Sequence, residues 1–246
     1  MAELHRVDRG AGPSIVFSHG AGADGEMFTA QAIALAEAGY HSVVYDLRGH
    51  GRSGGSFDAA AALDDLAGIV SGLDRPVLVG QSLGGNLAQA FVAAHHSLVS
   101  GLVVIGSAHN AAPLSRVDRA LLALAGPSLS VIPASRLGRI MADASAVTPE
   151  GRRYALEVFS RMPRSDFVRV FAATASLLSP DAGYRTPVPL LLMRGEHDRT
   201  GNIASGMPRW AAIEGVEEVV VPGAGHIANV DAPEAVTAAL LTFLAR

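Results

Sequence analysis

The sequence contains no cysteine, and this absence excludes disulfide bonds, zinc–thiolate centres and thiol nucleophiles. It contains no lysine either, so all 19 basic residues are arginines, and they form no cluster along the chain. Charged residues make up only 17% of the 246 residues, and the formal net charge is −4. This composition argues against a nucleic-acid partner, because such a partner requires a basic patch or stripe.

Two further absences concern secretion and the membrane. The N-terminal residues lack a positively charged start followed by an apolar stretch, so we expect no signal peptide. The longest apolar runs have the length of a β-strand, well short of a membrane span. Apolar residues are nevertheless abundant, at 49%, which is enough for a sizeable core. We therefore expect a cytoplasmic protein that does not associate with a membrane.

Strand-like and helix-like patterns alternate along most of the chain. Short apolar, β-branched runs predict buried strands, after a weak edge strand over 3–8, at 14–18, 41–45, 77–79, 102–105, 188–193 and 217–221. Helical spacing and its stop signals predict helices at 27–38, 58–70, 86–91, 208–214 and 233–245. This alternation is typical of βαβ units and predicts the α/β class, with a mostly parallel central sheet flanked by helices.

The alternation stops between residues 108 and 184, where no strand is predicted. Proline-punctuated helices are expected there at 116–125, 134–142, 149–161 and 165–178. Two crossover helices with long loops are the alternative, but structureless connections of that length are uncommon in compact domains. We therefore predict a core of residues 1–107 and 185–246 and an inserted helical cap of residues 108–184, which contributes to substrate binding.

The most informative stretch is 80–85, Gly-Gln-Ser-Leu-Gly-Gly, between a predicted buried strand and a helix. A strand that turns this sharply into a helix places Ser82 at the apex in a strained conformation. A Cβ at Gly80 or Gly84 would clash with the adjoining strand or helix. The Ser82 hydroxyl would then project above the sheet at a helix N-terminus, where backbone N–H groups favour negative charge. Ser82 is therefore the predicted nucleophile.

A serine nucleophile needs a base within hydrogen-bond reach and a third group that orients the base. Among the nine histidines, His226 follows a predicted strand and three small residues that would let its loop fold over the elbow. His19 also follows a strand, but we favour a structural role for it. The other histidines considered lie at the wrong end of an element, inside a tight turn, or beside the candidate acid: His41, His95, His96, His50 and His197.

The orienting acid must also follow a strand, and Asp198 meets this requirement, with Glu196 and Asp231 as competitors. The tetrahedral oxyanion of an acyl-transfer reaction also needs hydrogen-bond donors. We expect these to be the backbone N–H of Leu83, directly after the nucleophile, and that of Ala21 in the loop after the first buried strand.

Four landmarks occur in a fixed order, each at the end of a predicted strand. They are the His-Gly-Ala-Gly loop at 19–22, the Asp-Leu-Arg-Gly-His-Gly-Arg-Ser turn at 46–53, the elbow at 80–85, and the paired ends Gly-Glu-His-Asp at 195–198 and Gly-His at 225–226. Over nearly its whole length the chain thus resembles the serine-nucleophile branch of the α/β-hydrolase fold family. The resemblance implies an eight-stranded sheet with a helical lid, and neither a metal nor an organic cofactor. Because residues 3–18 supply only two predicted strands, the outermost N-terminal strand of the family is expected to be short or missing.

The expected function is hydrolysis of small or medium acyl esters or lactones through an acyl-enzyme, by a monomer or homodimer acting on a small molecule. A serine at position 82 argues against the haloalkane dehalogenase and epoxide hydrolase branches, whose chemistry needs a carboxylate nucleophile. Carbon–carbon bond hydrolases, enol-lactonases and perhydrolase-type relatives use the same triad and stay open as alternatives. A ligand-binding sensor that retains the triad is the non-enzymatic alternative.

Two sets of cap residues bear on the substrate. The apolar set either lines a pocket or, as we favour, mostly packs the cap onto the sheet: Leu121, Leu122, Leu124, Ile132, Leu137, Ile140 and Met141. The arginine set is expected to be mostly solvated, with one member available for a substrate carboxylate: Arg136, Arg139, Arg152, Arg153, Arg161, Arg164 and Arg169.

Overall fold

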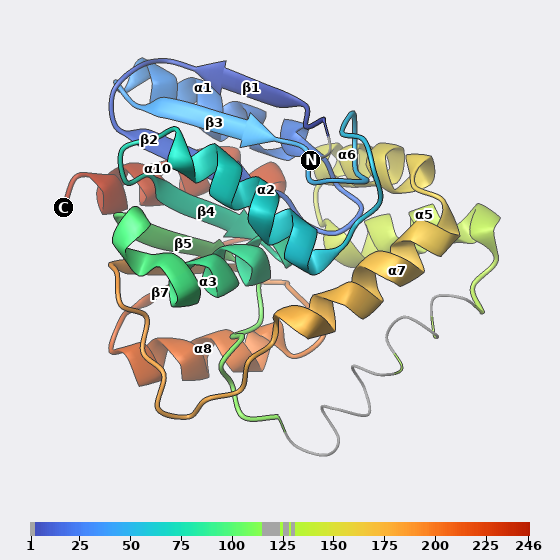
Figure 1. The fold of residues 1–246 in the computed structure, drawn as a ribbon. Helices are drawn as coiled ribbons and strands as arrows, with labels where there is room; N and C mark the ends of the chain where they lie inside the picture. Colours follow the sequence, from blue (N-terminus) through green and yellow to red (C-terminus); the bar gives the residue numbers. More distant parts are fainter. Residues whose placement is uncertain (1–2, 115–123, 125–127, 129–130) are drawn as a thin grey trace.

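A computed structural model describes residues 3–114, 124, 128 and 131–246. At its centre is one seven-stranded sheet with the strand order β1-β3-β2-β4-β5-β6-β7 (Figure 1). β1 pairs antiparallel with β3, and all other pairs are parallel. The strands are β1 (Arg6–Arg9), β2 (Ser14–Ser18), β3 (His41–Tyr45), β4 (Val77–Gln81), β5 (Gly101–Ile105), β6 (Leu190–Gly195) and β7 (Glu218–Val221).

Helices cover both faces of the sheet. The α-helices of the described residues are α1 (Thr29–Glu37), α2 (Ala59–Ser71), α3 (Leu83–His95), α5 (Ala134–Ser145), α6 (Pro149–Arg161), α7 (Arg164–Thr174), α8 (Ile203–Glu214), α9 (Ala228–Asp231) and α10 (Pro233–Leu244). Short 3₁₀ turns are η1 (Gly25–Phe28), η2 (His96–Leu98) and η3 (Ala175–Leu177).

Each strand sends alternate side chains into two separate cores. Phe17 of β2 joins the core under α1 and α10, whereas its neighbour Val16 joins the core under α2, α3 and α8. Figure 1 shows these two helix layers on opposite faces of the sheet. Because both faces are covered, the central strands are almost continuously apolar, as in parallel sheets generally.

The predicted α/β class with a mostly parallel sheet is confirmed. The described residues form seven strands rather than the eight that the resemblance implies. Only β1 precedes β2, so the outermost N-terminal strand is missing from this part of the chain, as the spacing of residues 3–18 predicts.

The start of α8 was predicted wrongly. The helix expected over 208–214 begins at Ile203, and Pro208 lies inside it. Proline is favoured in the first helical turn and disrupts helix interiors, so its local preference fits a start at position 208 better than an interior position. Here the amide of Gly206 already bonds to the carbonyl of Asn202, and Trp210 and Met207 are buried, so packing outweighs the local cost of proline.

The chain between β5 and β6 contains α5, α6 and α7, and no strand is found among its described residues. The helix expected at 116–125 lies outside the described residues, except for position 124. Leu137 is buried in the core, whereas Leu124 and Ile140 are largely exposed. No helix in the described part of the chain has both the length and the apolar character needed to cross a membrane.

Candidate active site

Ser82 lies at a sharp turn between β4 and α3. Its backbone has φ of +50° and ψ of −115°, a region that residues other than glycine rarely adopt. Its amide bonds to the carbonyl of Ile105 at 2.9 Å, and its carbonyl accepts from Asn86 at 3.0 Å. These two bonds hold the strained turn between the neighbouring strand β5 and the first turn of α3.

The glycines around Ser82 are required by close backbone contacts. A Cβ at Gly80 would overlap the carbonyl of Gly84, and a Cβ at Gly84 would overlap the carbonyl of Ser18 in β2. Gly85 is similarly close to Ser107, which follows β5. The elbow can therefore pack into the sheet only because these positions have no side chain.

Asp198 and His226 meet although they come from different strands. Asp198 follows β6, and its Oδ2 accepts a hydrogen bond from Nδ1 of His226 at 2.9 Å. The other carboxylate oxygen accepts the amide of Thr200 at 2.8 Å. With Nδ1 as the donor, Nε2 is the nitrogen left to accept a proton.

This pair is shielded from solvent, because the exposed fraction is 2% for Asp198 and 7% for His226. Burial alone would raise the pKa of the Asp198 carboxyl. The hydrogen bond and charge of His226, together with the hydrogen bonds from Thr200, outweigh burial and lower this pKa from its usual value. Asp198 is therefore ionised at neutral pH and favours a proton on the Nδ1 that faces it.

The sheet topology explains why these residues converge. β4, β5, β6 and β7 are neighbouring parallel strands, and their carboxyl ends meet at one edge of the sheet. Ser82 directly follows β4, and Asp198 and His226 lie in the loops after β6 and β7. The amide of Glu196 bonds to the carbonyl of Val221, the last residue of β7, and the amide of His197 bonds to that of Ala224 in the following loop, both at 2.9 Å. These bonds align the two loops.

Two residues that sequence reasoning missed support this arrangement. The Gln81 side-chain amide donates to the carbonyl of His226 at 3.0 Å. Gly106, with φ of +54°, leaves the space in which Asp198 and His226 meet, since a Cβ there would lie 3.2–3.3 Å from both side chains. Gln81 lies inside the elbow motif, and Gly106 directly follows β5. These positions are the sequence signals from which both residues could have been found.

The two competing acids have other partners. Glu196 is exposed and accepts the amide of Gly223 at 2.9 Å. Asp231 accepts four hydrogen bonds, from the amides of Val147, Thr148 and Gly225 and from the hydroxyl of Thr148, at 2.6–3.0 Å. Neither carboxylate contacts His226 through a hydrogen bond in the described part of the chain.

The loop after β2 contains Ala21, and Leu83 is the first residue of α3. The first amides of a helix have no intrahelical acceptor, so the amide of Leu83 is a free donor by position. The loop is braced by His19, whose Nδ1 donates to the carbonyl of Gly20 at 2.8 Å while its Nε2 accepts the amide of Leu47 at 2.8 Å. Burial lowers the pKa of His19, which keeps the ring neutral and fits this pair of bonds.

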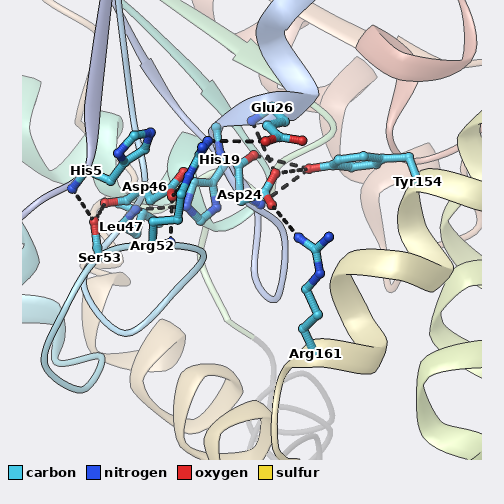
Figure 2. A network of polar contacts seen from close by, with 11 residues as sticks. His5, His19, Asp24, Glu26, Asp46, Leu47, Arg52, Ser53, Tyr154 and Arg161 are labelled. Atoms are coloured by element: carbon cyan, nitrogen blue, oxygen red, sulfur yellow. Dashed lines mark hydrogen bonds and ion pairs between the residues drawn. The ribbon is translucent and has the colours of Figure 1, made fainter.

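Figure 2 shows how this loop continues into a polar network with α6. The Tyr154 hydroxyl lies 3.0 Å from Oδ1 of Asp24, and Arg161 lies 3.8 Å from Oδ2. Asp46 accepts the amides of Gly25 at 2.7 Å and Arg52 at 2.8 Å. The network thus joins the loop after β2 to the turn after β3 and to α6.

A cavity of about 750 Å³ is lined by Ser82 and His226. Gly20, Ala21 and Gln81 line it on the sheet side. Met141, Arg152 and Phe159 contribute from the helices α5 and α6. Of the two cap sets named above, Met141 and Arg152 therefore reach the cavity. Arg199, which also lines it, was missed, although its place beside Asp198 was a signal.

Among the described residues, no group of three or more histidine and acidic side chains is arranged to hold a metal ion. The polar groups at the cavity include ones suited to acyl transfer: the Ser82 hydroxyl, the His226 imidazole bonded to the buried Asp198, and backbone amides. The arrangement can therefore activate a nucleophile and stabilise an oxyanion.

The model of the Alpha/beta hydrolase family matches residues 15–239 of the chain. The chain belongs to this family. The match runs from β2 into α10, so the α/β-hydrolase assignment applies to the fold as a whole and not to the elbow alone.

Two curated relatives match over almost the full chain. A 2-(acetamidomethylene)succinate hydrolase of Mesorhizobium japonicum is 27% identical, over 98% of this chain and 91% of that protein. A 2-hydroxy-6-oxononadienedioate/2-hydroxy-6-oxononatrienedioate hydrolase of Paraburkholderia phymatum is 28% identical, over 98% of this chain and 90% of that protein.

Solved structures agree on the fold. The enol-lactonase of Burkholderia xenovorans LB400 superimposes with a TM-score of 0.83 at 24% identity, covering 100% of this chain and 97% of that one. A thermophilic esterase of Thermogutta terrifontis gives a TM-score of 0.78 at 26% identity, covering 99% and 93%. Relatives of this α/β-hydrolase therefore carry several different hydrolase names.

Proposed function

We propose that this chain is a serine hydrolase that cleaves carboxylic esters or lactones of small or medium size, with residues 108–184 as its cap. The observation that supports this proposal best is the shared cavity of Ser82 and His226, combined with the 2.9 Å bond between His226 and the buried Asp198. This arrangement supplies a nucleophile, a base and an orienting carboxylate in the chain order typical of α/β-hydrolases.

In the first half-reaction the Ser82 oxygen attacks the carbonyl carbon of the substrate while Nε2 of His226 takes the hydroxyl proton. The carbonyl oxygen becomes an oxyanion, and the amides of Leu83 and Ala21 stabilise it. Collapse of this intermediate breaks the bond to the leaving alcohol, which takes the proton from His226. The acyl group is then held as an ester on Ser82.

In the second half-reaction water attacks that ester and gives a proton to Nε2 of His226. The new oxyanion collapses, the proton returns to the Ser82 oxygen, and the carboxylic acid leaves. Asp198 stays ionised throughout and stabilises the imidazolium that forms in each half.

A carbon–carbon bond hydrolase or an enol-lactonase is the second candidate. It is favoured by the names of similar proteins, which include a 2-hydroxy-6-oxononadienedioate/2-hydroxy-6-oxononatrienedioate hydrolase and an enol-lactonase. Both reactions begin with an activated carbonyl and use the same groups. An assay that offers simple esters beside lactones separates ester hydrolysis from lactone hydrolysis, and inactivity toward both would favour the carbon–carbon hydrolase.

Ser82→Ala is the direct test of the mechanism. We expect kcat toward p-nitrophenyl acyl esters to fall by about 10⁴-fold or more, because the variant lacks the nucleophile. The measurement is a stopped-flow assay over a chain-length series and a lactone panel. The wild-type protein should give a burst of p-nitrophenol, and the variant should give none.

Ser71→Ala, an exposed substitution on α2, is the matched control and should leave kcat unchanged. Near-normal turnover by Ser82→Ala would contradict the mechanism. Wild-type protein that is folded but inactive on esters and lactones alike would favour the carbon–carbon hydrolase or the ligand-binding alternative.

A further inference from the structure

The cavity above Ser82 carries an unequal set of charges. Among its described lining residues, the charged side chains are Arg152, Arg199 and Asp143. With histidine neutral, the lining therefore carries two guanidinium groups and one carboxylate. The part of the chain that is described gives none of the three an ion pair, whereas Arg161 pairs with Asp24 and Glu157.

Arg152 is held in place by backbone contacts. Its Nε donates to the carbonyl of Ala146 at 3.2 Å, and its amide bonds to the carbonyl of Thr148 at 2.9 Å. These contacts leave the two terminal nitrogens of the guanidinium available. A side chain anchored at Nε loses less conformational entropy when it binds a ligand than a freely rotating one.

The turn before α6, residues 145–148, supplies the carbonyls that bond to Arg152, and this turn is itself fixed to the loop that carries His226. Asp231 accepts the amides of Val147 and Thr148, each at 3.0 Å, and that of Gly225 at 2.8 Å. The amide of Ile227 bonds to the carbonyl of Ser145 at 3.0 Å. Gly225 and Ile227, the two neighbours of His226, are therefore both connected to the turn before α6. The Arg152 guanidinium thus has a defined place relative to the base.

Arg199 lines the cavity from another element. It lies between Asp198 and Thr200, which are joined by the 2.8 Å bond from the Thr200 amide to Oδ1 of Asp198. The backbone on both sides of Arg199 is therefore fixed, while its side chain is exposed. One guanidinium thus comes from α6 and the other from the loop after β6.

We propose that Arg152 and Arg199 form a carboxylate-binding subsite, so that the substrate is an ester or lactone that bears a second, free carboxylate. A guanidinium offers paired N–H donors that match the two oxygens of a carboxylate. The ester carbonyl would lie at Ser82 while the distal carboxylate lies against the arginines. This inference rests on the proposed esterase or lactonase function and names its substrate class.

The kinetic test compares monomethyl glutarate, which carries a free carboxylate, with dimethyl glutarate, which does not. In Arg152→Gln and Arg199→Gln, KM for the monomethyl ester should rise about tenfold, and kcat/KM for the dimethyl ester should stay within about twofold. Arg153→Gln is the matched control, because Arg153 is the next residue on α6, is also exposed and is not among the residues that line this cavity.

The binding test does not depend on turnover. Ser82→Ala protein is titrated by calorimetry with the same two esters. We expect the monomethyl ester to bind about tenfold more tightly, and this preference should disappear in Ser82→Ala with both arginines replaced by glutamine. Asp143→Asn should strengthen binding of the monomethyl ester, because it removes the opposing charge.

The two tests separate the two proposals. A preference for the monomethyl ester in calorimetry, with no hydrolysis by the wild-type protein, would overturn the esterase function and support the subsite. Equal or undetectable binding of both esters, or an equal effect of Arg153→Gln and Arg152→Gln, would overturn the subsite. Hydrolysis of both esters at equal efficiency would also overturn it and leave the esterase function intact.

Discussion

At the scale of single residues, the elbow is one of two places in the described part of the chain where a non-glycine residue has a strained backbone. In the described part of the chain, Ser82 and Arg75 are the non-glycine residues with positive φ. Such a conformation costs on the order of 1–3 kcal/mol and persists only where the surroundings over-determine it. For Ser82 the surroundings are the close contacts of Gly80 and Gly84 with neighbouring backbone. The residue held in this conformation is the nucleophile that we propose.

Gly84→Ala tests this steric requirement. The added methyl would overlap the carbonyl of Ser18 in β2, so we expect the free energy of unfolding to fall by about 3 kcal/mol or more, with loss of hydrolysis. Urea unfolding followed by circular dichroism provides the measurement.

Gly68→Ala is the control for Gly84→Ala. Gly68 lies inside α2, is exposed, and a Cβ there meets no atom within 4 Å. We expect this variant to be more stable by about 0.5–1 kcal/mol, because alanine loses less backbone entropy than glycine in a helix. Equal stability of the two variants would show that the elbow tolerates a Cβ.

At the scale of elements, α6 is held from two sides. Its N-cap residue Thr148 is bound to Asp231, beside the histidine loop, and Tyr154 and Arg161 contact Asp24, beside the loop after β2 (Figure 2). Gly22, with φ of +74°, allows direct packing, since a Cβ there would clash with the ring of Phe167 in α7. The helix is thus fastened to both loops that line the sheet side of the cavity.

Asp231→Asn tests one of these attachments. An amide nitrogen cannot accept a hydrogen bond, so at least one donor among Val147, Thr148 and Gly225 loses its partner. We expect a loss of about 2 kcal/mol in stability. Hydrogen exchange measured by mass spectrometry should become faster in segments 145–151 and 223–229 together.

Asp181→Asn is the matched control, because Asp181 is exposed and accepts a hydrogen bond from the amide of Gly183. It should leave exchange in both segments unchanged. Faster exchange in only one segment of Asp231→Asn would show that the carboxylate does not join the two loops.

At the scale of the whole molecule, buried histidines make stability depend on pH. Burial, together with the neighbouring His19, lowers the pKa of His50 to about 3. In the unfolded chain a histidine titrates near 6.5. Between these values the unfolded state binds more protons than the folded state, so stability is full above pH 6.5 and decreases as the pH falls. The loss is about 1.4 kcal/mol per pH unit for each such histidine.

His50→Gln should therefore reduce the loss of stability between pH 6.5 and pH 4, even if the variant is less stable at pH 7. Urea unfolding at a series of pH values gives the slope. His96→Gln, at an exposed position, should keep the wild-type slope. An unchanged slope in His50→Gln would mean that other groups cause the acid sensitivity.

The sequence predicts most of the fold because the signals are local. Apolar runs followed by glycine-rich turns identify β2 to β7, and the sterics of Gly80 and Gly84 identify the elbow. Residues that follow neighbouring parallel strands must lie near one another, which is why Asp198 and His226 could be paired on paper before their 2.9 Å contact was known.

Other parts of the site depend on contacts between distant segments. The bonds of Asp231 reach 83 and 84 residues back along the chain, and the bond from Gln81 to the His226 carbonyl spans 145 residues. No periodicity encodes such contacts, because they depend on how loops settle against one another. The start of α8 was missed for a similar reason, since burial of Trp210 and Met207 outweighs the propensity of Pro208.

Because α6 is hydrogen-bonded both to Asp24 and, through its N-cap, to Asp231, it cannot simply be replaced by the equivalent helix of another protein. A chimera that takes segment 134–177 from another α/β-hydrolase would bring new side chains to the cavity but also leave Asp24 and Asp231 in the recipient. Unless the donor segment supplies a hydroxyl near the place of Tyr154 and an N-cap near that of Thr148, both carboxylates lose partners. Changing the substrate range by exchanging this segment therefore requires that positions 24 and 231 be changed together with it, so that both ends of each contact match.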